Sequence, residues 1–192
     1  MYRLLNKMEN KAFIINLLSK DNTSFAIREE LPRLLSVIPE LEAMMGFEHQ
    51  HPHHHLNVWE HTLLAIDNSA NRLEIRLALL LHDIGKPHSY QQEGAVRHYR
   101  GHAEKSCEIA KSVLQRLDFD TEKVGYVCEI IKKHDTFLTE SDMQTNFELS
   151  KDIFEVQRCD ALAHNPLYNE KRLVYIERTA DLLGRYTIDD CK

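Results

Sequence analysis

A histidine and an aspartate, His82 and Asp83, stand side by side where an apolar run meets a turn. The surrounding segment reads LALLLHDIGKP, so the carboxylate of Asp83 follows directly on residues typical of a protein core. A carboxylate buried there is costly unless it is paired or bound to a metal. Imidazole nitrogens and carboxylate oxygens together suit zinc, manganese, iron, cobalt or nickel. The alternative is a helix-end aspartate that faces solvent, because such a dipeptide also arises by chance.

The pair cannot chelate an ion alone, because adjacent residues of a helix point in different directions. Two further residues have suitable chemistry: His61 lies one predicted helix earlier, and Asp160 lies in a predicted helix well downstream. A helical bundle brings such positions together across its core. The pattern therefore predicts a metal site formed by side chains from several helices.

Histidine is present in large excess, with twelve in 192 residues. Five of them lie together in the segment HQHPHHH, namely His49, His51, His53, His54 and His55. A run of adjacent histidines in a loop lacks the fixed geometry of a metal site. We therefore expect this loop to line the rim of the site and at most to contact substrate.

The elements that must position these residues are helices, because the spacing of apolar residues is helical nearly everywhere and no strand alternation is convincing. Asn57 predicts a helix start, since it can act as N-cap with Glu60 three residues later. Gly85 and Pro87 predict the end of the helix that carries His82. Helices are expected at residues 2–19, within 24–45, from 57, and at 72–84, 102–117, 121–134, 150–164 and 168–184, with loops at 88–101 and 135–149. The sequence thus predicts an all-α protein, a bundle of seven to nine helices.

The length of 192 residues fits one domain. We expect a metal-binding core at residues 46–192, with residues 1–45 as a helical extension packed on it. The four cysteines are Cys107, Cys128, Cys159 and Cys191. No CxxC pair occurs and three of them follow apolar helical patterns, which favours a reducing, cytoplasmic setting. The N-terminus lacks a signal-peptide layout, and no apolar run reaches the length of a membrane span.

The net charge is −6 with histidine neutral. This balance argues against extended nucleic-acid binding, which needs clustered lysine and arginine. It is compatible with a small phosphorylated substrate, because a bound cation reverses the local charge. Nothing in the pattern indicates an oligomeric state.

The order His61, His82-Asp83, Asp160 resembles the HD-domain phosphohydrolase superfamily. The segments LPRLLSVIPELEAMMG, NVWEHTLLAID, LALLLHDIGKP, GHAEKS and IIKKHD are similar to the HD domain found C-terminal in some bacterial tRNA nucleotidyltransferases, over residues 30–165. The resemblance implies an HD-domain helical bundle and a divalent metal. It does not imply nucleotide addition to tRNA, because this chain has no room for a nucleotidyltransferase head.

Two further histidines lie between the HD pair and the last aspartate: His102 begins a predicted helix and His134 ends one. Some HD enzymes with two metals resemble this chain in having such extra histidines. That resemblance implies that Asp83 bridges two ions, with His61, His82 and Asp160 on one and His102 and His134 on the other. The alternatives are one ion, with these two histidines binding phosphate or protonating the leaving group, or two ordinary surface histidines.

Three basic residues are candidates for binding substrate. Lys86 follows the HD pair, so its ammonium can reach a substrate phosphate, as the resemblance implies. The alternative is a lysine that complements the helix C-terminus. Arg97 and Arg100 lie in the predicted loop at 88–101, which either meets an anionic substrate or is a solvated basic loop.

Together, these features predict a metal-dependent phosphohydrolase with one or two divalent ions. The resemblance implies a small nucleotide-like substrate, a phosphomonoester or a 2′,3′-cyclic phosphodiester. The metal would activate water, Asp83 would orient it, and Lys86 would offset phosphoryl charge. The alternatives are a nucleotide-binding regulatory module without turnover, and an enzyme acting by the same chemistry on RNA ends.

Overall fold

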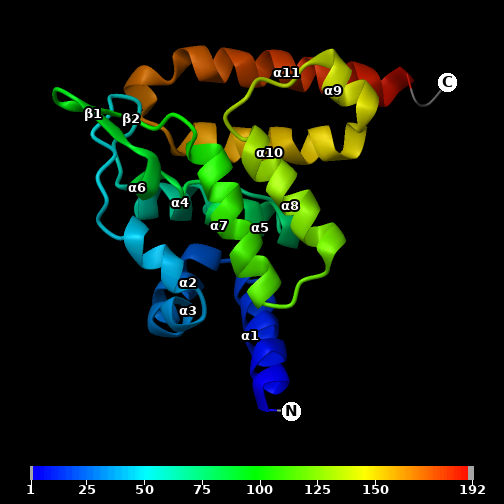
Figure 1. Ribbon diagram of the computed structural model, residues 1–192. Helices are drawn as coiled ribbons and strands as arrows, with labels where there is room; N and C mark the ends of the chain where they lie inside the picture. The colour runs from blue at the N-terminus through cyan, green and yellow to red at the C-terminus, as the bar shows by residue number, and fades with distance from the viewer. Residues whose placement is uncertain (1, 190–192) are drawn as a thin grey trace.

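The computed structural model describes residues 2–189, with side chains for residues 6–184. Over this range the chain forms eleven α-helices, two short 3-10 helices and one two-stranded hairpin, which confirms the all-α class (Figure 1). The helices are α1 (Tyr2–Leu18), α2 (Thr23–Glu29), α3 (Leu31–Val37), η1 (Pro39–Met44), α4 (Val58–Asp67), α5 (Leu73–Leu81), α6 (Lys86–Ser89), α7 (His102–Arg116), α8 (Thr121–Lys133), α9 (Glu140–Thr145), α10 (Phe147–Ala163), η2 (Pro166–Tyr168) and α11 (Glu170–Asp189). Cys191 lies outside the described residues.

Helix α5 is the centre of the bundle. Each residue from Ile75 to Leu81 is buried, because the helix packs against α1, α4, α8 and α10, and all of these residues except Arg76 are apolar. Its C-cap is His82, so the HD pair lies where the central helix ends inside the protein. Figure 1 shows α10 and α11 lying along one another at one end of the molecule, with α1 to α3 at the other.

The predicted N-cap of α4 is confirmed. The Asn57 side chain accepts a hydrogen bond from the Glu60 backbone N–H at 2.9 Å. The carboxylate of Glu60 does not close a capping box; it pairs with Arg28 of α2. Arg76 of α5 donates to the carbonyl of Leu18 at the end of α1 at 2.7 Å. These contacts join residues 1–45 to the rest of the chain, and the division into extension and core stays a prediction.

Two segments predicted as loops contain short elements. Residues 88–101 include the antiparallel strands β1 (Gln91–Glu93) and β2 (Val96–His98), joined through Gly94 at φ +62°. Strands of three residues are too short to show alternation. Residues 135–149 include α9, which begins at a capping box of Thr139 and Asp142. No helix in residues 2–189 is both long and apolar enough to cross a bilayer.

Candidate metal centre

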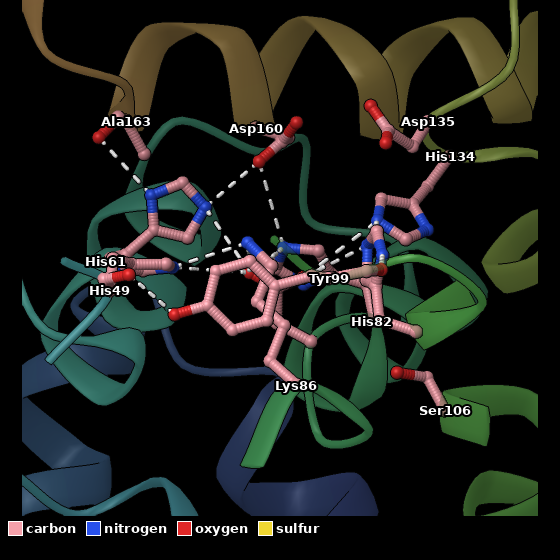
Figure 2. Close-up of polar contacts among 12 residues, drawn as sticks. His49, His61, His82, Lys86, Tyr99, Ser106, His134, Asp135, Asp160 and Ala163 are labelled. Atoms are coloured by element: carbon pink, nitrogen blue, oxygen red, sulfur yellow. Dashed lines mark hydrogen bonds and ion pairs between the residues drawn. The ribbon is translucent and has the colours of Figure 1, made fainter. Parts of the chain in front are cut away.

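Six side chains from separate helix ends and faces meet in one buried cluster. They are His61 of α4, His82 and Asp83 after α5, His102 at the start of α7, His134 at the end of α8 and Asp160 of α10. Figure 2 shows the imidazoles of His61 and His134 on opposite sides of this cluster. The structure therefore brings together every residue that the sequence predicts as a metal ligand.

One side of the cluster contains His61, His82 and Asp160. The Nε2 atom of His61 lies 2.8 Å from Oδ1 of Asp160, and Nε2 of His82 lies 3.7 Å from the same oxygen. Oδ2 of Asp83 faces this side, 3.7 Å from His61 Nε2 and 3.3 Å from His82 Nε2. Four ligand atoms from three helical segments thus surround one position.

The other side contains His102 and His134. Their Nε2 atoms lie 3.1 Å apart, and Oδ1 of Asp83 is 3.6 Å from the first and 3.8 Å from the second. The two carboxylate oxygens of Asp83 therefore face two different sets of imidazoles. Such an arrangement suits a carboxylate that bridges two cations.

The four imidazoles share one orientation. Each Nδ1 lies against a backbone carbonyl, which accepts its hydrogen: Ala163 for His61 at 3.2 Å, Leu79 for His82 at 2.6 Å, Tyr99 for His102 at 2.8 Å and Ile131 for His134 at 2.6 Å. A carbonyl only accepts, so Nδ1 of each ring carries a proton, and each Nε2 atom points toward the cluster, where a ring that is neutral presents a lone pair. This carbonyl support is typical of histidine metal ligands.

The pair of His102 and His134 fits a cation on its own geometry. Burial lowers the pKa of His102, and burial together with the neighbouring His102 lowers the pKa of His134 to about 3. Both rings are therefore neutral near pH 7, with two Nε2 lone pairs facing one another. Oδ1 of Asp83 is also buried without a hydrogen-bond partner among the described residues. A cation between these three atoms would satisfy all of them.

The first side has a different charge balance. Burial alone would lower the pKa of His82, but the carboxylates of Asp83 and Asp160 raise it to about 10. Burial would likewise raise the pKa of Asp83, but His82 and Lys86 hold it well below its ordinary value. Positive charge on His82 thus balances the carboxylates, and a bound cation would take over this function because ligand histidines must be neutral.

Lys86 lies buried at the floor of the cluster. Its Nζ is 2.8 Å from Oδ2 of Asp83 and 3.2 Å from Nε2 of His49. Figure 2 shows Lys86 beside His49 and His82. His49 is buried, and its Nδ1 lies 2.8 Å from the Leu56 carbonyl. The expectation that the histidine-rich segment 49–55 only lines the rim of the site is therefore wrong for His49, which is buried beside Lys86. The sequence shows an excess of histidine here but no signal that separates His49 from its neighbours.

A cavity of about 550 Å³ opens beside the cluster. Its lining includes the rim histidines His51, His53 and His54 together with Lys86, Arg97, Arg100, His102, His134 and Asp160. The guanidinium of Arg97 is engaged by the protein, since it donates to the Glu48 carbonyl at 2.7 Å and lies over the rings of Phe47 and Tyr90. Arg100 lines the same cavity and is exposed. A second hollow, between η1 and α7, contains none of the predicted site residues.

Two more residues lie near Asp160: Arg172, which no sequence pattern indicates, and His164, whose spacing of one helical turn places it on the same face of α10. Arg172 of α11 lies 2.8 Å from Oδ2 of Asp160 and 3.1 Å from Oδ1 of Asp135. His164, one turn after Asp160, places Nδ1 4.0 Å from the same Oδ2. Arg172 thus engages the outer oxygen of Asp160 while the inner oxygen faces His61 and His82. No local motif marks Arg172, because it reaches the site through the packing of α11 on α10.

Comparison with known proteins gives one family. The model of the HD domain family matches residues 53–176. The CC-adding tRNA nucleotidyltransferase of Thermus thermophilus is 33% identical over 92% of this chain. The A-adding tRNA nucleotidyltransferase of Deinococcus radiodurans is 32% identical over 60% of it, and the multifunctional CCA protein of Azoarcus sp. is 27% identical over 79%. The matched regions span 42%, 28% and 36% of these three relatives, respectively.

Proposed function

The chain belongs to the HD domain family, and on that basis we propose that it is a metal-dependent phosphohydrolase acting on nucleotide-like phosphoesters. The observation that carries the proposal is the cluster of four carbonyl-supported imidazoles around the two oxygens of Asp83. A site that only bound a nucleotide would not need four imidazole Nε2 atoms directed at one carboxylate. The same set is what a hydrolytic metal centre requires.

We assign the ligands as two sets that share Asp83. His61, His82 and Asp160 would hold one divalent ion with Oδ2 of Asp83. His102 and His134 would hold a second ion with Oδ1. The mixture of imidazole and carboxylate suits iron, manganese, cobalt, nickel or zinc.

A bound ion would lower the pKa of water toward neutrality and offset negative charge on the phosphoryl group. The protein's own contribution is orientation. The two oxygens of Asp83 lie between the two imidazole sets, where this carboxylate would orient the attacking water. Arg172 holds the outer oxygen of Asp160, so that carboxylate keeps its inner oxygen directed at His61 and His82.

Lys86 is proposed as the residue that binds the phosphoryl group. An ammonium has three donors, and two of them face Asp83 and His49. The third is available to a phosphoryl oxygen in the cavity that Lys86 lines. Arg100 is the second candidate, because it lines this cavity and is exposed. Arg97 is a weaker candidate because its guanidinium is already engaged.

Two of the relatives are tRNA nucleotidyltransferases, which favours RNA ends as a second class of substrate. A nucleotide at the end of an RNA presents the same phosphoester as a free nucleotide. The substrate test should therefore include short RNAs that end in a 2′,3′-cyclic phosphate beside the small nucleotides.

The test is a turnover screen of the purified protein. Nucleoside monophosphates, 2′,3′-cyclic nucleotides and the RNAs above are each assayed with Mn, Ni, Co, Fe and Mg added separately. We expect turnover with at least one pair, and its loss in Asp83→Asn. Asp181→Asn, an exposed carboxylate outside the cavity, is the matched control and should keep full activity. Nucleotide binding without turnover by any metal-loaded protein would instead favour the regulatory module.

A further inference from the structure

An aromatic ring stands exposed at the edge of the cavity, close to the metal centre. Phe137 is 71% exposed, although a phenyl ring of this size is normally buried. It lines the cavity that also contains His102, His134 and Lys86. Phe137 follows His134 by three residues, a length of chain that spans at most about 11 Å. The Cα atoms of Phe137 and His134 are therefore close, and both side chains line the same cavity.

The backbone that carries Phe137 is held in place by a buried amide. Nε2 of Gln157 donates to the carbonyls of Lys133 and Thr136, at 2.8 and 2.7 Å. These carbonyls flank the turn between α8 and Phe137. Gln157 is itself buried and comes from α10, so the turn is fixed to the core. Satisfied buried networks of this kind make a segment rigid.

Tyr175 of α11 completes the support from the other side. Its hydroxyl donates to Oε1 of Gln157 at 2.7 Å and accepts from the Leu138 N–H at 2.9 Å. Its ring lies 4.5 Å from the ring of Phe137, centroid to centroid, at 42°. A second aromatic ring thus supports Phe137, and the backbone on both sides of it is hydrogen-bonded to the core, while most of its side chain stays exposed.

We propose that Phe137 is the stacking platform for the nucleobase of the substrate, which makes the substrate a nucleotide and not a phosphorylated sugar alone. This inference rests on the proposed function and extends it to the substrate class. A rigid exposed ring loses little conformational freedom when a base stacks on it. Stacking is tolerant of base identity, because every base has a π face. When the base of a nucleotide stacks on Phe137, the phosphate of that nucleotide would extend toward Lys86 and the proposed ligands.

The experiment compares matched substrates with and without a base in Phe137→Ala. For a nucleoside monophosphate we expect KM, and the Kd measured by titration calorimetry, to rise by about 5- to 100-fold. For ribose 5-phosphate, which has no base, both constants should stay within about twofold of those of the unmodified protein. Phe137→Trp should restore nucleotide affinity. Phe25→Ala removes an equally exposed ring, 63% exposed on α2 and outside the cavity, and should change neither constant.

The outcomes separate this inference from the proposed function. Equal effects of Phe137→Ala on both substrates, or none on either, would overturn the platform while leaving hydrolysis intact. A loss of nucleotide binding in a protein that turns over no substrate would support the platform and contradict the enzyme. A change in oligomeric state with unchanged nucleotide affinity would mean that the ring contacts another copy, and would also overturn the inference.

Discussion

Asp83 brings together the two halves of the site, since each of its carboxylate oxygens faces a different pair of imidazoles. A buried carboxylate is costly to maintain without a partner. Here the partners are His82 and Lys86, whose positive charge holds the pKa of Asp83 low. The same carboxylate is therefore available as a charged ligand over the whole neutral pH range.

The role of Lys86 can be tested at the level of the residue. Lys86→Met keeps the length of the side chain and removes its charge. If Lys86 binds the phosphoryl group, kcat should fall by about 100- to 1,000-fold, as for loss of a donor to the transition state. Metal content should stay unchanged. Steady-state kinetics and elemental analysis on the same sample measure both.

Lys105→Met, on the exposed face of α7, is the matched control for this change. It should leave kcat within about twofold of the unmodified protein. A Lys86→Met protein with nearly normal kcat would contradict the proposed role and favour a lysine that only complements the end of its helix.

At the level of elements, Gly85 sets the distance between the HD turn and α7. A Cβ at this position would lie 2.5 Å from the carbonyl oxygen of His102 and 2.6 Å from the backbone nitrogen of Ser106. The Gly85 N–H also donates to Oγ of Ser106 at 2.9 Å. Only glycine allows this approach, and the approach brings His102 to the Oδ1 side of Asp83.

Gly85→Ala should therefore separate the two halves of the site. Backbone atoms cannot move aside as a flexible side chain can, so we expect a loss of about 1–3 kcal/mol in the free energy of unfolding. We also expect weaker metal binding at His102 and His134. Urea unfolding and metal titration measure the two effects.

Gly125→Ala is the control, because nothing lies within 4 Å of a Cβ at this position in α8. It should raise the free energy of unfolding by about 0.5–1 kcal/mol through helix propensity. If Gly85→Ala were as stable as the unmodified protein and bound metal normally, the close approach would have no role in assembling the site.

The elements also show how far the sequence could predict the site. His82, His102 and His134 lie at helix ends that the sequence predicts. A shared site at the ends of these helices could therefore be expected. Arg172 and His49 could not be identified in this way. Both approach the site through tertiary packing, of α11 on α10 and of the loop after η1 on Lys86. Residues 91–98 and α9 were missed because each element is too short for its periodicity to be visible.

At the scale of the whole molecule, the proposed ligands come from segments that span most of the bundle, from α4 to α10. These ligands come together only when the helices are packed as they are in the fold, so both ions need the folded chain. A cation that binds the folded chain and not the unfolded chain stabilises the folded state. The metal centre and the helical core should therefore behave as one cooperative unit.

The most direct measurement is the number of metal equivalents bound per chain, by elemental analysis after loading and desalting. The account predicts about two for the unmodified protein and for His55→Ala, an exposed histidine outside the cluster. It predicts about one for His102→Ala, and weakened binding of both ions for Asp83→Ala. A protein that takes up no metal under any loading condition, or a His102→Ala protein that keeps both ions, would contradict it.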